Sequence, residues 1–119
     1  MDILVIVNES PWGSSLATAA LRFVRAAQHA GKEVAAVFFH GDGIYNALPG
    51  RVSDDGLPCA VQDWCELAGQ GETELLLCSA SSARRLAQSI VNELPGEFRE
   101  SGLVRMWELA GRCDCVVTF

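Results

Sequence analysis

The segment LLLCSASSARR, residues 75–85, joins two kinds of secondary structure. Its first four residues are typical of the end of a buried strand, and the small residues and two arginines that follow are typical of the first turn of a helix. A cysteine, Cys78, stands at the junction. A buried strand that runs directly into a helix is characteristic of parallel sheets, so we expect strands and helices to alternate along the rest of the chain.

The alternation continues on both sides of this segment. Predominantly apolar runs predict buried strands at residues 3–7, 34–39, 74–78 and 115–119. After the first run, apolar residues at helical spacing predict a helix that Gly31 ends. The remaining predicted elements are an HGDG turn at 40–43, a loop at 47–58, a helix at 59–68 with Val61, Trp64, Cys65 and Ala68 inward, a helix running from Cys78 to Pro95, and a helix after Ser101 as its N-cap.

This order predicts an α/β fold with one domain over residues 1–119. We expect a doubly wound, mostly parallel sheet of four to five strands with helices on both faces. Sites in such sheets lie at the carboxyl ends of the strands. The loops Asn8–Gly13, His40–Asn46 and Cys78–Ser82 should therefore converge at one edge.

The composition excludes several classes of function. The formal net charge is −6 and the nine basic residues form no stripe, which argues against direct binding of nucleic acid. The apolar runs are far shorter than a membrane span, and the amino terminus lacks the basic region of a signal peptide. We therefore expect a cytoplasmic protein with no membrane partner.

The five cysteines do not predict disulfides or a metal site. Their odd number and the missing secretion signal argue against a disulfide framework. No CxxC pair is present and the two histidines lack ligand spacing, so we expect neither zinc nor any cofactor. The CDC sequence should place Cys113 and Cys115 on one face of a strand, packed in the core. We assign no functional role to Cys59, Cys65 or Cys115.

Two interpretations of Cys78 stay open on position alone. At the start of a helix the thiolate is favoured, and Ser79, Arg84 and Arg85 could stabilise it further. Alternatively, Cys78 is a small residue that closes a tight junction. Among nearby side chains, His40 is interpreted as polar surface, and the aromatics Trp12 and Trp107 as core or subunit contacts.

If Cys78 is a nucleophile, two chemistries fit unequally. Cys78 and Arg84 stand in the C-x5-R relation of cysteine phosphatases, but the intervening SASSA has no glycine, Arg85 stands where Ser or Thr is expected, and no Asp-Pro acid loop occurs. Sulfur transfer requires an accessible cysteine of low pKa and neither metal nor cofactor. The simple surroundings of Cys78 favour sulfur transfer.

Over nearly its whole length the chain resembles the DsrE/TusD family of sulfur-relay proteins. The resemblance is carried by SPWGSSLATAALRF after the first strand, VFFHGDGIYNA after the second, CSASSARR after the third, and FRESGL and CDCVVTF near the end. It implies a doubly wound parallel sheet and a sulfurtransferase whose persulfide is carried on Cys78.

The resemblance also implies partners. The family works in hetero-oligomers with related small subunits of the DsrF/TusC and DsrH/TusB types. Sulfur would arrive from a TusA-like donor and leave to a TusE/DsrC-like acceptor, for 2-thiouridine synthesis in tRNA or for sulfur oxidation. The alternatives are a non-catalytic structural subunit of the same assembly or, less well supported, a C-x5-R phosphatase or arsenate-reductase-like enzyme.

Overall fold

The computed structural model of the chain describes residues 2–12, 14–49 and 60–119. Five strands form one sheet in the order β4-β3-β2-β1-β5, and every neighbouring pair is parallel. The predicted doubly wound α/β fold is thereby confirmed. The strands are β1 (Asp2–Val7), β2 (Glu33–Phe39), β3 (Glu74–Cys78), β4 (Phe98–Ser101) and β5 (Cys115–Thr118).

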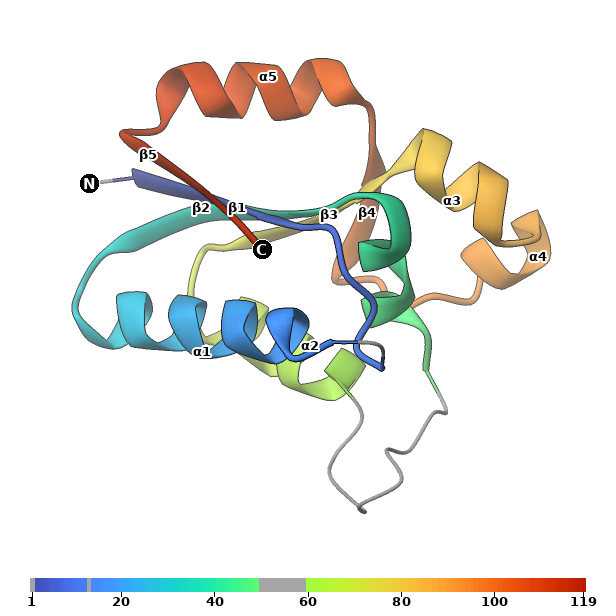
Figure 1. The fold of residues 1–119 in the computed structure, drawn as a ribbon, viewed down its shortest axis with the longest axis horizontal. Helices are drawn as coiled ribbons and strands as arrows, with labels where there is room; N and C mark the ends of the chain where they lie inside the picture. Colours follow the sequence, from blue (N-terminus) through green and yellow to red (C-terminus); the bar gives the residue numbers. More distant parts are fainter. Residues whose placement is uncertain (1, 13, 50–59) are drawn as a thin grey trace.

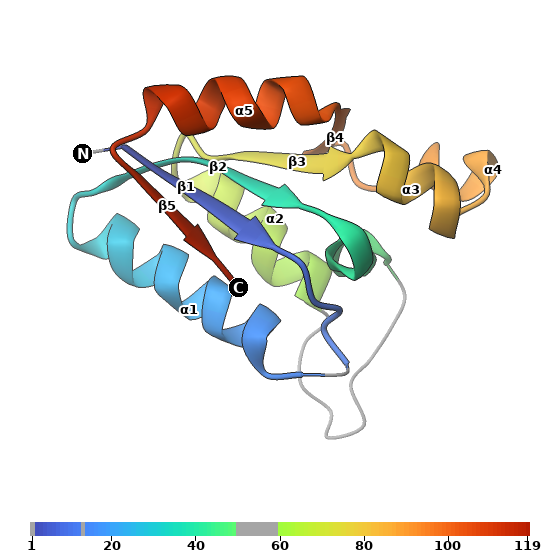
Figure 2. The same ribbon diagram turned by 45° about the horizontal axis from the view of Figure 1, so that its top comes forward.

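Helices cover both faces of the sheet, as Figure 1 shows. On one face lie α1 (Leu16–His29) and α2 (Ala60–Gln70), and on the other lies α5 (Leu103–Arg112). The short helices α3 (Ser79–Arg85) and α4 (Gln88–Val91) project from the end of β3 and cover neither face (Figures 1 and 2). A 3-10 helix, η1 (Gly41–Ala47), follows β2 at the same end of the sheet. None of the helices in the described part of the chain is long and apolar enough to cross a membrane.

The sheet separates two apolar cores of unequal size. The larger core lies under α1 and α2 and includes Trp64, whose ring meets Phe39 edge-on at a centroid distance of 5.2 Å. The smaller core lies under α5 and is built from alternate residues of the same strands. The buried members of the smaller core are Leu4, Ala36, Phe38, Leu76, Cys78 and Leu109.

The end of α1 follows the prediction in detail. Gly31 has a φ of 76°, and its N–H donates to the carbonyl of Gln28. The N–H of Lys32 donates to the carbonyl of Ala27. These two bonds form a Schellman motif, in which the left-handed residue is preferably glycine.

The single helix predicted between Cys78 and Pro95 is wrong. The helix ends at Arg85, the backbone is extended at Leu86 (φ −125°, ψ 140°), and α4 has only four residues. Because this segment leaves the edge of the sheet, its helix-spaced apolar residues have no sheet face to cover. Leu86 instead packs against the larger core, and Ile90 is exposed.

The predicted N-cap at Ser101 is also wrong, because Ser101 is the last residue of β4, a strand that the sequence analysis did not place. Only Phe98 of this edge strand is buried, so its polar pattern resembles a loop. Gly102 is the N-cap residue of α5 and forms no side-chain capping bond.

Two smaller expectations need correction, and one lies partly outside the described residues. The HGDG turn continues as the seven-residue 3-10 helix η1. Cys113 and Cys115 lie against opposite cores, because Cys113 is the C-cap residue that follows α5 and only Cys115 belongs to β5. The predicted loop 47–58 falls mostly outside the described residues, as does Cys59, whereas the helix that follows is confirmed as α2.

Candidate functional site at the carboxyl edge of the sheet

Three segments converge at the carboxyl edge of the sheet, as predicted. Nδ1 of His40, after β2, lies 3.2 Å from Oδ1 of Asn8, after β1. The N–H of Gly41 donates to Oγ of Ser81 in α3 over 2.9 Å. The side-chain amide of Asn46 donates to the carbonyl of Glu9 over 3.0 Å. The loops after β1, β2 and β3 therefore form one connected structure.

Cys78 also lies at this edge, between the ends of β4 and β2. It is the last residue of β3, and with φ −60° and ψ 116° it is also the N-cap residue of α3. The other described cysteines lie elsewhere: Cys65 on α2, and Cys113 and Cys115 before and at the amino end of β5. Among the described cysteines, position therefore favours Cys78 as the functional thiol.

The thiol of Cys78 is buried in the isolated chain. Its residue is 1% exposed and belongs to the smaller core, together with residues of the sheet such as Phe38 and Leu76 and with Leu109 of α5. Sulfur transfer requires a thiol that another protein can reach. In this conformation the chain does not offer one, so a carrier role for Cys78 needs a change that uncovers it.

The three residues predicted to stabilise a thiolate differ in their solvent exposure and in their contacts. Ser79 and Arg84 are exposed. Arg85 forms an ion pair with Asp42, with Nε and Oδ1 2.9 Å apart, and its Nη1 donates to the carbonyl of Ser81 over 3.4 Å. The charge of Arg85 is thus shared with a carboxylate, and its visible role is to join α3 to η1.

Sequence reasoning recognised the turn after β2 but missed how it is held. Gly41 has a φ of 57°, a conformation that favours glycine. A Cβ on Gly43 would collide with the backbone carbonyl of Val7. The two glycines of HGDG are the signal that such a close approach requires. Ser81 and Asp42, which bond this turn to α3, carried no comparable signal.

Two buried polar atoms at this edge have no hydrogen-bond partner. They are Oδ1 of Asn46 and Oγ of Ser82, and they are the only such side-chain atoms within the described residues. Most buried polar groups in proteins are paired. Asn46 lies in η1 and Ser82 lies in α3, so both unpaired atoms belong to segments that meet at the carboxyl edge of the sheet. Folded proteins retain such unfavourable groups mainly at functional or strained sites.

The helix α3 argues against the phosphatase alternative. A cysteine phosphatase wraps its loop around the phosphate so that several backbone N–H groups point inward. Here residues 79–85 are α-helical from the residue after Cys78 onward, and no such loop is formed.

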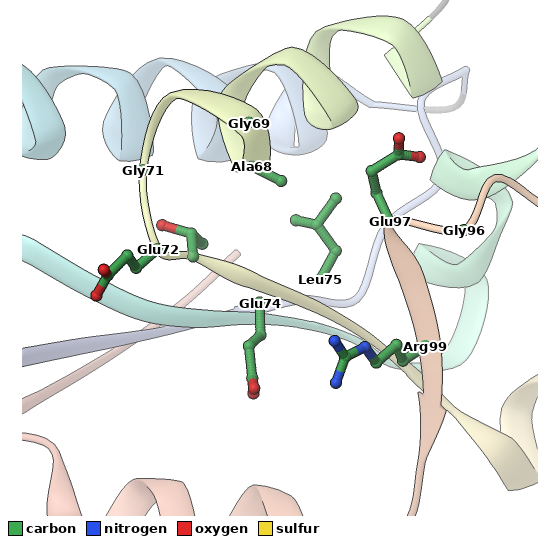
Figure 3. Close-up of a pocket in the computed structure, with 10 residues that line it drawn as sticks. Ala68, Gly69, Gly71, Glu72, Glu74, Leu75, Gly96, Glu97 and Arg99 are labelled. Carbon is green, nitrogen blue, oxygen red and sulfur yellow. The ribbon is translucent and has the colours of Figure 1, made fainter.

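A pocket of about 280 Å³ lies at the other end of β3 and is not part of this site. Figure 3 shows Glu74 and Arg99 on one side of the sheet, and Glu97 extending to the other side, toward α2. The thiol of Cys65 donates to Oε2 of Glu97 over 3.5 Å. Burial, followed by this bond and by the charge of Glu97, raises the pKa of Cys65 to about 11.

The thiol of Cys113 is also a poor nucleophile. Burial raises its pKa, and the nearby carboxylate of Asp2 raises it further. A raised pKa keeps a thiol protonated, and the thiolate is the reactive form. Electrostatics therefore agree with position in setting Cys65 and Cys113 aside.

The fold and this edge together define a small parallel α/β protein with a single cysteine at the end of its third strand. The sequence model of the DsrE/DsrF-like family matches residues 1–119. The chain belongs to the DsrE/DsrF-like family, and the resemblance inferred from the sequence is confirmed.

Relatives of known name agree over the full length. A protein of Sodalis glossinidius named sulfurtransferase TusD is 33% identical along an alignment that covers the whole chain and 98% of that protein. The sulfurtransferase TusD of Salmonella paratyphi B is 34% identical, with both chains covered completely. The crystal structure of the ychN protein from E. coli superposes with a TM-score of 0.82 at 20% identity, over all of this chain and 99% of that one. That similarity supports the fold.

Proposed function

We propose that this protein is a sulfurtransferase subunit that carries sulfane sulfur as a persulfide on Cys78. The observation that carries the proposal is the place of Cys78: among the described cysteines it is the one at the carboxyl edge of the parallel sheet, where loops after three strands meet. Full-length similarity to proteins named sulfurtransferase supports the class of reaction.

The proposed reaction needs no oxidant or cofactor. The thiolate of Cys78 attacks the terminal sulfur of a donor persulfide, R–S–SH. A new S–S bond forms at Cys78 while the S–S bond of the donor breaks, and the donor leaves as a thiolate that takes up a proton. A thiol of the acceptor then attacks the terminal sulfur on Cys78, which restores the Cys78 thiol. Each step exchanges one S–S bond for another, so the number of electrons is unchanged.

The proposal extends to partners and location. Membership of the family supports a relay complex with related small subunits, and we propose a TusA-like donor and a TusE/DsrC-like acceptor. The four described cysteines are free thiols, which fits the reducing cytoplasm that a persulfide relay between thiols requires.

The experiment that tests this function is intact mass spectrometry after incubation with a persulfide-generating donor. We expect a gain of one sulfur atom that a reductant reverses and that Cys78→Ser abolishes. Cys65→Ser is the matched control and should keep the gain, because the raised pKa of Cys65 makes it a poor acceptor. A gain that survives Cys78→Ser would place the sulfur on another cysteine and refute the proposal.

One observation favours a second function, that of a non-catalytic subunit. Cys78 is buried like an ordinary core residue, which is what a structural cysteine would show. The mass experiment repeated with the partner subunits present separates the two. No sulfur on Cys78 in either sample would make this chain a structural component of the assembly.

A further inference from the structure

The register of the sheet ties Cys78 to the beginning of α5. In the ladder between β3 and β4, Cys78 is paired with Ser101. Ser101 ends β4, and α5 begins at Leu103 after the single residue Gly102. Both views place this end of α5 beside the junction of β3 and α3 (Figures 1 and 2). The first turn of α5 therefore starts next to Cys78.

The side chain of Cys78 lies on the face that α5 covers. Leu75 and Leu77 of β3 belong to the larger core, and the alternate residues Leu76 and Cys78 belong to the smaller one. Met106 of α5 packs against the smaller core. Among the described helices, α5 is the one that lies over this face (Figure 1), and its Leu109 belongs to the same small core as Cys78.

The contacts that hold α5 in place are few. Leu109 is its only buried residue. Its ion pair between Arg105 and Glu74 spans 3.7 Å and joins partly exposed side chains, so it contributes little. The N-cap residue Gly102 offers no side-chain acceptor to the free N–H groups of the first turn. A segment with so few buried contacts opens at a smaller cost than the rest of the fold.

The opposite side of Cys78 is held more firmly. The helix α3 is joined to η1 by the ion pair of Arg85 with Asp42 and by the bond from Gly41 to Ser81. Ser81 and Ser82 of α3 are themselves buried. Exposure of the thiol by a movement of α3 would break all of these contacts together.

We infer that the first turn of α5 is a lid over Cys78, that it pivots at Gly102, and that its opening exposes the thiol for sulfur transfer. This inference rests on the proposed function, because only a carrier has to present its thiol to another protein. The sequence of events is then local: the turn Leu103–Met106 lifts, Cys78 reacts, and the turn closes over the product.

The test is the rate at which iodoacetamide alkylates Cys78 in the folded, full-length chain, followed by peptide mass at constant pH. Met106→Ala removes part of the packing of α5 against the core that contains Cys78, and we expect alkylation about tenfold faster. Gly102→Ser supplies a neutral N-cap, and we expect alkylation about twofold slower. Serine fits there because φ is −85° and a Cβ would meet nothing within 4 Å.

Two control variants distinguish opening of the lid from other ways of exposing the Cys78 thiol. Val104→Thr changes a residue of the same turn that is 72% exposed, and it should leave the rate unchanged. Asp42→Ala loosens the α3 side by removing the carboxylate that pairs with Arg85, and it should accelerate alkylation much less than Met106→Ala does. An equal acceleration by Asp42→Ala, or a wild-type rate in Met106→Ala, would overturn the lid.

The experiment also distinguishes opening of the lid from the proposed carrier function and from unfolding of the chain. Alkylation requires no persulfide, so a faster Met106→Ala that gains no sulfur would support the lid and refute the carrier role. If Met106→Ala fails to fold, the Gly102→Ser variant still decides, because slower alkylation is expected from a chain that is at least as stable. Alkylation of Gly102→Ser at or above the wild-type rate would count against the lid.

Discussion

Nε of Arg85 lies 2.9 Å from Oδ1 of Asp42, and this ion pair joins α3 to the 3-10 helix that follows β2. Arg84, the neighbouring residue, is exposed. Two adjacent arginines that look equivalent in the sequence therefore have different surroundings. The pair gives a matched comparison of an arginine that holds the carboxyl edge together with one that faces solvent.

We expect Arg85→Gln to lower the free energy of unfolding by about 0.5 to 1 kcal/mol, the range of a partly exposed ion pair. Arg84→Gln should change it by less than about 0.5 kcal/mol, as exposed substitutions usually do. Urea denaturation of the two variants measures both values. Equal losses in the two variants would mean that the ion pair with Asp42 contributes nothing specific.

A second prediction follows from the close approach of Gly43 to the backbone of Val7. Gly43→Ala would drive a Cβ into the carbonyl of Val7, at the end of β1, and neither backbone can yield cheaply. We expect a loss of more than about 2 kcal/mol, as for overpacking in a tight core. Gly111→Ala in α5 meets nothing within 4 Å and should stabilise the chain by up to about 1 kcal/mol, the difference in helix propensity. Thermal unfolding of both variants checks the opposite signs.

The pKa of Cys65 predicts how its reactivity depends on pH. Because burial and Glu97 raise this pKa to about 11, the thiolate fraction should rise about tenfold per pH unit from pH 7 to pH 10. Alkylation of Cys65, followed by peptide mass, should show that slope. Glu97→Gln removes the charge and should make Cys65 react faster at pH 8, although burial, the larger cause, persists. A plateau of the rate below pH 9 would show that the pKa is not raised.

The helical state of residues 79–85 predicts indifference to oxyanions. A cysteine phosphatase binds phosphate or vanadate in its active loop and is stabilised by them. Since α3 forms no such loop, millimolar phosphate or vanadate should leave the thermal unfolding temperature unchanged. A dose-dependent rise that Arg84→Gln abolishes would revive the C-x5-R interpretation.

Much of the fold was predictable because local pattern and tertiary context agree there. The runs at 3–7, 34–39 and 75–78 belong to strands that are largely buried on both faces, so each run is apolar throughout and can be recognised without its neighbours. Gly31 ends α1 through its own backbone conformation, a local property. The convergence of three loops at one edge followed from parallel strands alone, before any contact was known.

The prediction of secondary structure failed for segments whose conformation depends on contacts with distant parts of the chain. The apolar residues of 86–94 have helical spacing, but the chain turns off the sheet after α3, so a continuous helix there would have no sheet face to cover. The strand β4 buries only Phe98 and is defined by its pairing with β3, which the polar FRES sequence does not reveal. Ser81 and Asp42 matter only because η1 and α3 meet.

For this protein, the sequence by itself determined the alternation of strands and helices and the place of Cys78 at the carboxyl end of a parallel strand. Only the tertiary structure decided on which face the thiol lies and what covers it. The reason is physical: which side of β3 is covered by α5 depends on β4 pairing beside it and on the chain crossing back at Gly102. Those are long-range contacts, and residues 75–85 carry no local trace of them.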